Sequence, residues 1–140
     1  MFSATEMKVV KGADFHIETV PFSYVAEKKL YILDEEECGN LAYESFEAVG
    51  FAVTKDISEA PLLVVMYGVP ETISETIPEE LAESVKVGSL EVICLWDALS
   101  LLTSGMIESY DENTGMIHMR TGAVYNSVHE LLMDGINNPL

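Results

Sequence analysis

Three histidines are the residues whose type best suits acid–base or metal chemistry in this 140-residue chain: His16, His118 and His129. Imidazole changes charge near neutral pH and is a common metal ligand. No two of the three share a helix turn, and none has a ligand spacing such as HxxxH or CxxC. Asp14 and His16 are two residues apart on an expected strand and share a face, which we interpret as a solvated pair rather than a metal site. An enzyme that uses His16 or His118 is the weakest of the hypotheses considered.

Four consecutive acids form the densest carboxylate cluster: Asp34, Glu35, Glu36 and Glu37. Such a cluster attracts divalent cations, but it lacks the spaced oxygen ligands and the turn glycine of a calcium loop. Asp34 is a good helix N-cap, Glu37 is its capping-box partner, and Leu33 and Cys38 are spaced for a hydrophobic staple. We therefore interpret the acids as the start of a helix, and no metal site is predicted.

The two cysteines and the sequence motifs add no chemistry. Cys38 falls on the expected helix and Cys94 on an expected buried strand, so two buried free thiols are predicted, with a disulfide as the alternative. The chain has no GxGxxG, GxxxxGK[ST] or GxSxG motif. No cofactor is predicted, and the chain is predicted not to be an enzyme.

The charge balance limits the classes of partner. The chain has 24 acidic and 7 basic residues, a net charge of −17. No direct binding to nucleic acid is predicted, because phosphate contacts need Lys and Arg. Three interpretations of the acids remain: a soluble surface, a docking face for a basic partner, or a mimic of nucleic-acid charge.

Length and hydropathy predict one domain that spans residues 1–140. A hydrophobic content of 49% indicates a well-filled core and argues against disorder. The opening Met1–Gly12 has no apolar run of the length that a secretory signal needs, and no run of 18 apolar residues occurs, so no membrane span is predicted. The compartment stays open, with a cytoplasmic or virion-associated location favoured.

The stretch from Leu33 to Gly68 organises the predicted fold. Apolar residues recur at three- and four-residue steps from Cys38 to Val49, which predicts a helix that Gly50 ends. A strand is expected at Phe51–Thr54, and an acidic turn follows. Leu62–Tyr67 is apolar on both faces, which predicts a central strand.

The flanking segments supply the other expected elements. Strand residues are expected at Met7, Val9 and Val10, near Phe15–Phe22 with Pro21 at an edge or strand end, at Leu30–Leu33, and at Leu90–Trp96. Asp97–Ser104 is either a short helix capped by Asp97 or a bent continuation of that strand. Met106–Tyr110 and Met116–Arg120 should form a hairpin around Gly115, and a helix at Ala123–Asp134 should end at Gly135, before a non-helical tail.

These elements predict an α+β fold. We expect a mixed or antiparallel sheet of five or six strands, covered on one face by the helices near Glu35–Val49 and Ala123–Asp134. The predicted core consists of Leu33, Leu41, Phe46, Phe51, Val53, Leu63, Val65, Leu90, Val92, Cys94, Val128, Leu131 and Leu132.

The segment Val69–Gly88 is predicted to be a long acidic loop with at most one helical turn, at Pro78–Ser84. Loops of this length in a compact domain are often functional. The predicted partner-binding residues are Asp34, Glu35, Glu36, Glu37, Glu71, Glu75, Glu79, Glu80 and Glu83.

Four short segments resemble a known group of proteins: Tyr43–Phe51, Ala60–Gly68, Asp111–Arg120 and Val124–Met133. They look like parts of small bacterial envelope lipoprotein domains, similar to penicillin-binding-protein activators, the amino-terminal domain of TolB and uncharacterised lipoproteins. The resemblance implies a periplasmic, non-catalytic domain that binds other envelope proteins. The chain departs from the group because it has no lipobox cysteine and a strong negative charge.

The predicted function is a non-enzymatic assembly or adaptor subunit of bacterial or phage origin that acts through protein–protein contacts. It would join other protein subunits, among them a basic protein, in a homo- or hetero-oligomer, a multi-subunit complex or a virion. One alternative is a periplasmic lipoprotein-type accessory domain. The other is an acidic inhibitor or immunity protein that covers a basic nucleic-acid-binding surface.

Overall fold

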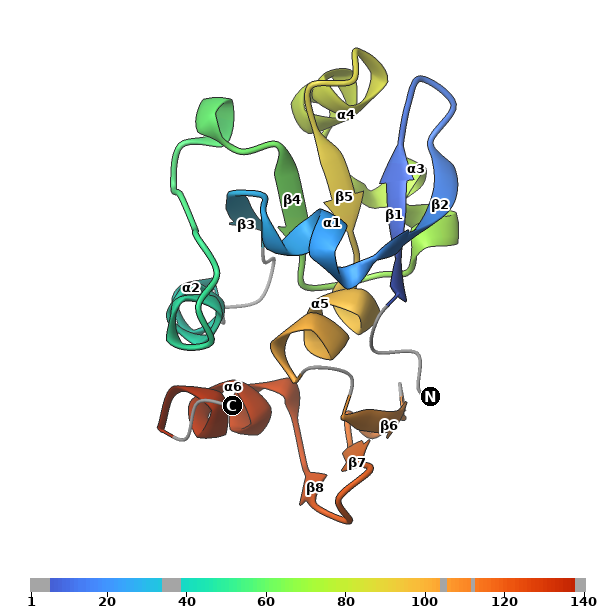
Figure 1. Cartoon of the computed structure of the whole chain (residues 1–140). Helices are drawn as coiled ribbons and strands as arrows, with labels where there is room; N and C mark the ends of the chain where they lie inside the picture. The colour runs from blue at the N-terminus through green and yellow to red at the C-terminus, as the bar shows by residue number, and fades with distance from the viewer. Residues whose placement is uncertain (1–5, 34–38, 104–105, 112, 138–140) are drawn as a thin grey trace.

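The structure is a computed structural model that describes residues 6–33, 39–103, 106–111 and 113–137. These residues form two sheets and the helices around them (Figure 1). In chain order the elements are β1 (Glu6–Lys11), β2 (His16–Pro21), α1 (Phe22–Ala26), β3 (Leu30–Leu33), α2 (Gly39–Ala48), the short 3-10 helix η2 (Ile57–Glu59), β4 (Leu62–Val65), the 3-10 helix η3 (Pro70–Thr72), α3 (Ile73–Thr76), α4 (Glu79–Lys86), β5 (Glu91–Ile93), α5 (Leu95–Leu102), β6 (Ile107–Tyr110), β7 (Ile117–Met119), β8 (Val124–Tyr125) and α6 (Val128–Asn137).

The larger sheet has five strands in the order β2-β1-β5-β4-β3. β3, β4 and β5 run parallel, and the β1–β2 hairpin joins β5 in antiparallel fashion. The predicted α+β class with a mixed five-stranded sheet is therefore confirmed. β4 lies between β3 and β5 and is buried at all four positions, as its uninterrupted apolar run predicts. β2 is an edge strand that ends at Pro21, where the missing N–H costs no sheet hydrogen bond.

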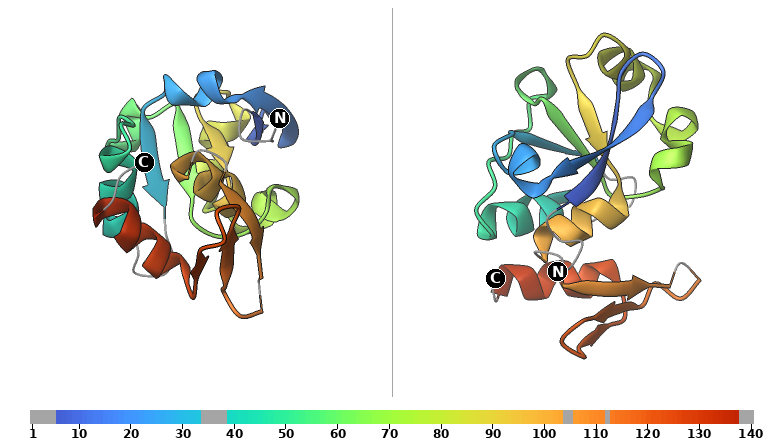
Figure 2. Two further views of the ribbon diagram at one scale, coloured as in Figure 1. Left: turned by 60° about the horizontal axis from the view of Figure 1, so that its bottom comes forward. Right: turned by 45° about the vertical axis from the view of Figure 1, so that its right-hand side comes forward.

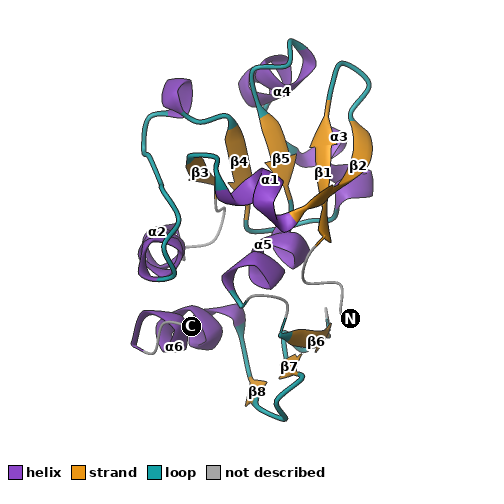
Figure 3. Cartoon of the chain, in the orientation of Figure 1, coloured by secondary structure: helices purple, strands orange, loops and turns teal. Residues whose placement is uncertain are grey.

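Both faces of this sheet are covered. On one face Phe46 of α2 and Leu99 of α5 pack on Leu62 and Val64, and α6 adds residues to the same apolar cluster from beyond α2. The two predicted helices thus lie on the same side. On the other face Leu63, Val65 and Val92 pack against α3 and α4, a layer that the sequence analysis did not anticipate (Figure 3).

That second layer corrects the prediction of a long acidic loop at Val69–Gly88. The segment is mainly helical, in η3, α3 and α4. Pro70 and Pro78 start its helical pieces, where a residue without an N–H is tolerated. Ile73, Ile77 and Val85 recur at multiples of four residues and reach the core, so an apolar stripe lies among the glutamates.

The strand expected at Phe51–Thr54 is reduced to a single parallel bridge between Leu30 and Val53. Beyond that bridge the edge of β3 is occupied by a side chain. The Tyr43 hydroxyl of α2 accepts a hydrogen bond from the Ile32 N–H at 3.2 Å and donates to the Ile32 carbonyl at 3.4 Å. The phenol therefore takes the place that a longer strand would need.

The strand expected at Leu90–Trp96 is shorter than predicted. β5 ends at Ile93, and α5 begins at Leu95 after Cys94 as its N-cap. Asp97 lies in the first turn of that helix rather than at its cap. A short apolar run of this kind fits a strand or a buried helix equally well, so hydrophobic pattern alone could not place the boundary.

The hairpin prediction is confirmed, and the last helix is corrected. β6 and β7 pair in antiparallel fashion, and Gly115 has a positive φ of 79°. With β8 they form a separate three-stranded sheet, which gathers with α6 at one end of the molecule (Figure 2).

The last helix begins at Val128 rather than at Ala123. The Ser127 hydroxyl accepts from the Glu130 N–H at 3.2 Å, and the Glu130 carboxylate accepts from the Asn126 N–H at 2.7 Å, a local cap of the S-x-x-E type. Val124 belongs to β8, and α6 continues through Gly135 to Asn137, into the tail that was expected to be non-helical.

The predicted core largely matches the observed one. Buried members are Phe46, Leu63, Val65, Leu90, Val92, Cys94, Leu131 and Leu132, and Leu33, Leu41, Phe51, Val53 and Val128 are half-buried and pack against them. Cys94 is a free thiol. The expected helix cap at Asp34, Glu37 and Cys38 lies outside the described residues. In the described part of the chain, no helix has the length and apolar character that crossing a membrane requires.

Candidate functional site

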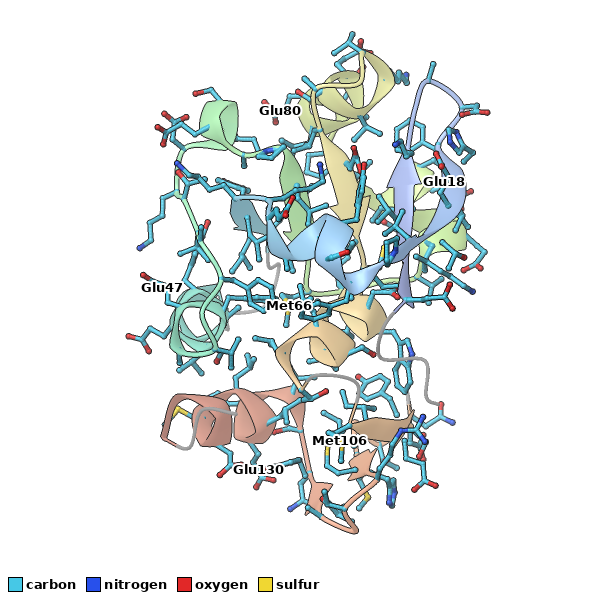
Figure 4. All side chains as sticks on the ribbon, viewed as in Figure 1. Glu18, Glu47, Met66, Glu80, Met106 and Glu130 are labelled. Carbon is cyan, nitrogen blue, oxygen red and sulfur yellow. The ribbon has the colours of Figure 1, made fainter. Side chains whose placement is uncertain are left out.

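The five glutamates predicted in the 69–88 segment share one exposed surface. We call the acidic face the set Glu71, Glu75, Glu79, Glu80 and Glu83, all of which are exposed. They lie on η3, α3 and α4, outside the core stripe; Glu80 is labelled on α4 in Figure 4. Among the described residues, the one ion pair that these glutamates form joins Glu83 to Lys86 at 3.7 Å. The other predicted partner-binding acids, Asp34 to Glu37, lie outside the described residues.

A hollow of about 430 Å³ opens next to the acidic face. It lies at the ends of β4 and β5, and its walls come from the start of β1, from Thr19 of β2, from the segment after β4 and from the first turns of α5. The carboxyl ends of parallel strands are the side of an open sheet on which ligands bind at topological switch points, and here the β1–β2 hairpin joins the parallel strands beside the hollow. Glu71 belongs both to the hollow and to the acidic face, so the two surfaces are continuous.

Trp96, the single tryptophan of the chain, lines this hollow. Its side chain is 38% exposed, although it lies in the first turn of an otherwise well-buried helix. Its ring packs against Tyr110 of β6, with centroids 6.4 Å apart and planes tilted by 52°. The indole is therefore held in place by a neighbouring ring and still presents surface to a ligand, which is typical of a binding anchor.

Asp97, next to Trp96, also lines the hollow and is only 8% exposed. Its Oδ1 accepts a hydrogen bond of 3.0 Å from the Lys8 N–H, which ties α5 to the start of β1. The Asp97 carboxyl also interacts with its own backbone N–H, and the charge of Lys8 favours its ionised form. Burial raises the pKa of the Asp97 carboxyl, and the charge of Glu71 adds to that shift.

Apolar, acidic and basic side chains line the hollow around Asp97, and Lys8 is the basic one. Val69 contributes exposed apolar surface, and Glu6 and Glu71 supply carboxylates. Beneath them, burial together with the charges of Asp97 and Glu71 raises the pKa of the Cys94 thiol to about 12. Cys94 therefore stays protonated at neutral pH and is no nucleophile. The hollow suits a ligand that is apolar in part and positively charged.

His16 is engaged on both sides of its ring. Nδ1 lies 2.7 Å from Asp14 Oδ1, and Nε2 lies 2.7 Å from Glu18 Oε2, all on exposed side chains. Hydrogen bonds to Asp14 and to Glu18 raise the pKa of His16. The expected solvated pair is thus present, with Glu18 as a third member that its two-residue spacing could have predicted.

The structure does not bring the three histidines together. His118 is exposed on β7 and His129 on α6, whereas His16 is on β2. Within the ranges that the structure describes, no group of three His, Cys, Asp or Glu side chains is placed to hold a metal ion.

A second polar network surrounds Glu91 on β5. The Tyr24 hydroxyl of α1 donates to this carboxylate, 2.6 Å from Oε1 and 2.7 Å from Oε2. Lys11 and Lys28 lie 3.8 and 4.0 Å from Oε2, and both ammonium groups also approach the Tyr24 ring. Because each charge in this network already has a partner, it anchors α1 on the sheet and offers no open group to a ligand.

Comparisons with protein-family models, with curated proteins and with solved structures give no match to this chain. The resemblance to envelope lipoprotein domains stays a prediction. The sequence analysis identified the acidic face but missed Trp96 and Asp97. One signal could have found them: the pair follows a buried parallel strand directly, at the edge of the sheet where ligands bind.

Proposed function

We propose that this chain is a non-enzymatic adaptor or assembly subunit that binds a basic segment of a partner protein. The binding surface is the hollow around Trp96 together with the adjoining acidic face. The observation that supports the proposal is Trp96, an exposed aromatic side chain that contacts Tyr110 and lines a hollow together with Glu6, Glu71 and Asp97.

The two parts of this surface have different tasks. Trp96 and Val69 offer apolar area, which supplies affinity once water is displaced. The acidic face attracts a basic partner from a distance and orients it, which mainly raises the association rate. Glu71, Glu75, Glu79 and Glu80 form no ion pair within the described residues, so their negative charge is available to attract the incoming chain.

The partner is expected to be a different protein rather than a second copy. Each chain has a net charge of −17, so two copies repel one another. A basic partner is attracted by the same negative charge.

The probe for this proposal is a random heptapeptide library displayed on phage and selected on the purified chain. We expect enriched peptides that combine lysine or arginine with an apolar residue. Synthetic copies that lack tryptophan should change the fluorescence of Trp96, the only indole in the chain. Affinity should fall at least about tenfold between low and high salt, because exposed charges are screened beyond roughly 8 Å at physiological ionic strength.

A matched pair of triple variants tests the acidic face. Reversing Glu75, Glu79 and Glu80 to lysine should weaken binding and leave the fold intact, because all three side chains are exposed. The control reverses three exposed acids elsewhere: Glu44, Glu47 and Glu108. Both variants change the net charge equally, so only a loss specific to the first supports a local docking surface. A selection that enriches no basic peptide, or salt-insensitive binding, would contradict the proposal.

A further inference from the structure

We infer, building on the proposed function, that the hollow takes one cationic side chain of the partner, a lysine or an arginine, between the Asp97 carboxylate and the Trp96 ring. The acidic face would attract the partner as a whole, whereas this position would select one residue of it.

The first step of the argument is the state of Asp97. A carboxylate that is 8% exposed has lost most of its water and needs hydrogen-bond donors in exchange. In the described part of the chain its donors are backbone groups alone, the N–H of Lys8 on Oδ1 and its own N–H. A lysine ammonium or an arginine guanidinium that enters the hollow would supply donors and opposite charge to Oδ2.

The second step is the chemistry of the neighbouring wall. The face of a tryptophan ring is the best aromatic partner for a cation, and its surface also packs against the methylene stem of lysine or arginine. Trp96 contacts Tyr110 and is 38% exposed, so part of its surface is open to such a stem. A purely apolar side chain would use the ring but bring no hydrogen-bond donor and no direct ion pair to the carboxylate.

The third step concerns the charges that face Asp97. Glu71 after β4 adds negative charge, and the Cys94 thiol below is neutral. The charge of Lys8 favours the ionised form of Asp97, but among the described residues no ion pair joins the two side chains, and the hydrogen bond comes from the Lys8 backbone amide. Lys8 therefore acts on Asp97 from a distance, and a cation of the partner could contact the carboxylate directly.

The variant Asp97→Asn tests this arrangement. An asparagine can keep the hydrogen bond from the Lys8 N–H through its carbonyl oxygen, while it removes the charge. Glu47→Gln on the outer side of α2 removes one charge far from the hollow and serves as the matched control (Figure 4). Circular dichroism of both variants checks that the fold is kept.

The readout is a coupling between one position of the peptide and Asp97. In the selected peptide each lysine is replaced in turn by norleucine and each arginine by citrulline, which removes the charge and keeps the size. At one position the replacement should weaken binding to the wild type by about tenfold or more. The same replacement should have almost no effect in Asp97→Asn, and its full effect in Glu47→Gln.

A measurement on the unmutated protein covers the case in which Asp97→Asn does not fold. The carboxyl carbon of Asp97 should shift in an NMR spectrum on addition of the charged peptide and not with its neutral analogue. If peptides bind and respond to the acidic-face variants but no position couples to Asp97, this inference is wrong and the proposed function stands. If no basic peptide is selected at all, both fail.

Discussion

The hydroxyl of Ser45 on α2 donates a hydrogen bond of 3.0 Å to the carbonyl oxygen of Leu132 on α6. Ser45 is 2% exposed and Leu132 is buried in the same cluster, so this polar contact lies inside an apolar interface. It joins residues 87 positions apart and fixes how α6 sits on α2.

Removal of this contact should weaken the α2–α6 interface. We expect Ser45→Ala to lower the free energy of unfolding by about 1 kcal/mol, because the buried Leu132 carbonyl loses its side-chain donor. Urea denaturation followed by circular dichroism measures the change. The control is Ser74→Ala, at an exposed position of α3. Its free energy of unfolding should stay within about 0.5 kcal/mol of the wild-type value. Equal effects of the two substitutions would argue against the interface role.

Phe46 should be the costliest side chain of α2 to truncate. It is fully buried, and its ring meets that of Phe51 edge-on at 5.8 Å. Phe46→Ala should lower the free energy of unfolding by about 3 to 5 kcal/mol, the usual cost of deleting a buried ring. Denaturant titration at several temperatures measures this loss. A loss below about 1 kcal/mol would mean that neighbouring side chains move to fill the cavity.

His16 should titrate above the usual pKa of 6.5, because Asp14 and then Glu18 hydrogen-bond its protonated ring. Since the pKa is raised in the folded state, the stabilisation is fully present below pH 6.5 and is lost as the pH rises through the folded value. An NMR titration of the His16 ring measures the pKa. Asp14→Asn should lower it more than Glu18→Gln does, and no change in either variant would contradict the observed contacts.

Asp97 should make the protein less stable as its carboxyl ionises. Burial raises its pKa above the ordinary 3.8, so stability is lost as the pH rises from that value through the folded pKa. Asp97→Asn has no such loss and should be the more stable protein at pH 7, with the difference absent well below pH 3.8. Melting temperatures of both proteins across this range test the sign. A difference that does not depend on pH would show that ionisation of Asp97 is not its cause.

The sequence predicts those elements whose signals are local and agree with one another. The apolar stripe of α2 and the doubly buried run of β4 are examples, since each is decided by side chains within one element. The layer of α3 and α4 was missed because its many glutamates suggested a loop, although Ile73, Ile77 and Val85 carry a helical period. The helix cap formed by Ser127 and Glu130 could likewise have been predicted from its S-x-x-E pattern but was missed.

The candidate site likewise has one part that the sequence predicts and one part that it does not. Exposure of the acidic face follows from its composition and was predicted. The hollow depends on Asp97 meeting the backbone of Lys8, 89 residues away, and on Trp96 meeting Tyr110 of another sheet. Contacts between such distant parts of a chain leave no trace in local pattern, so only the folded arrangement reveals them.

The hydrogen bonds between Tyr43 and Ile32 affect the tendency of the protein to aggregate at high concentration. The outer border of a sheet is a template on which another chain can add a strand, and unprotected borders lead to aggregation. Here the phenol occupies both backbone groups of Ile32, just beyond the bridge at Val53. Tyr43 of α2 therefore blocks strand addition at Ile32 on the edge of β3, in addition to its packing in the core.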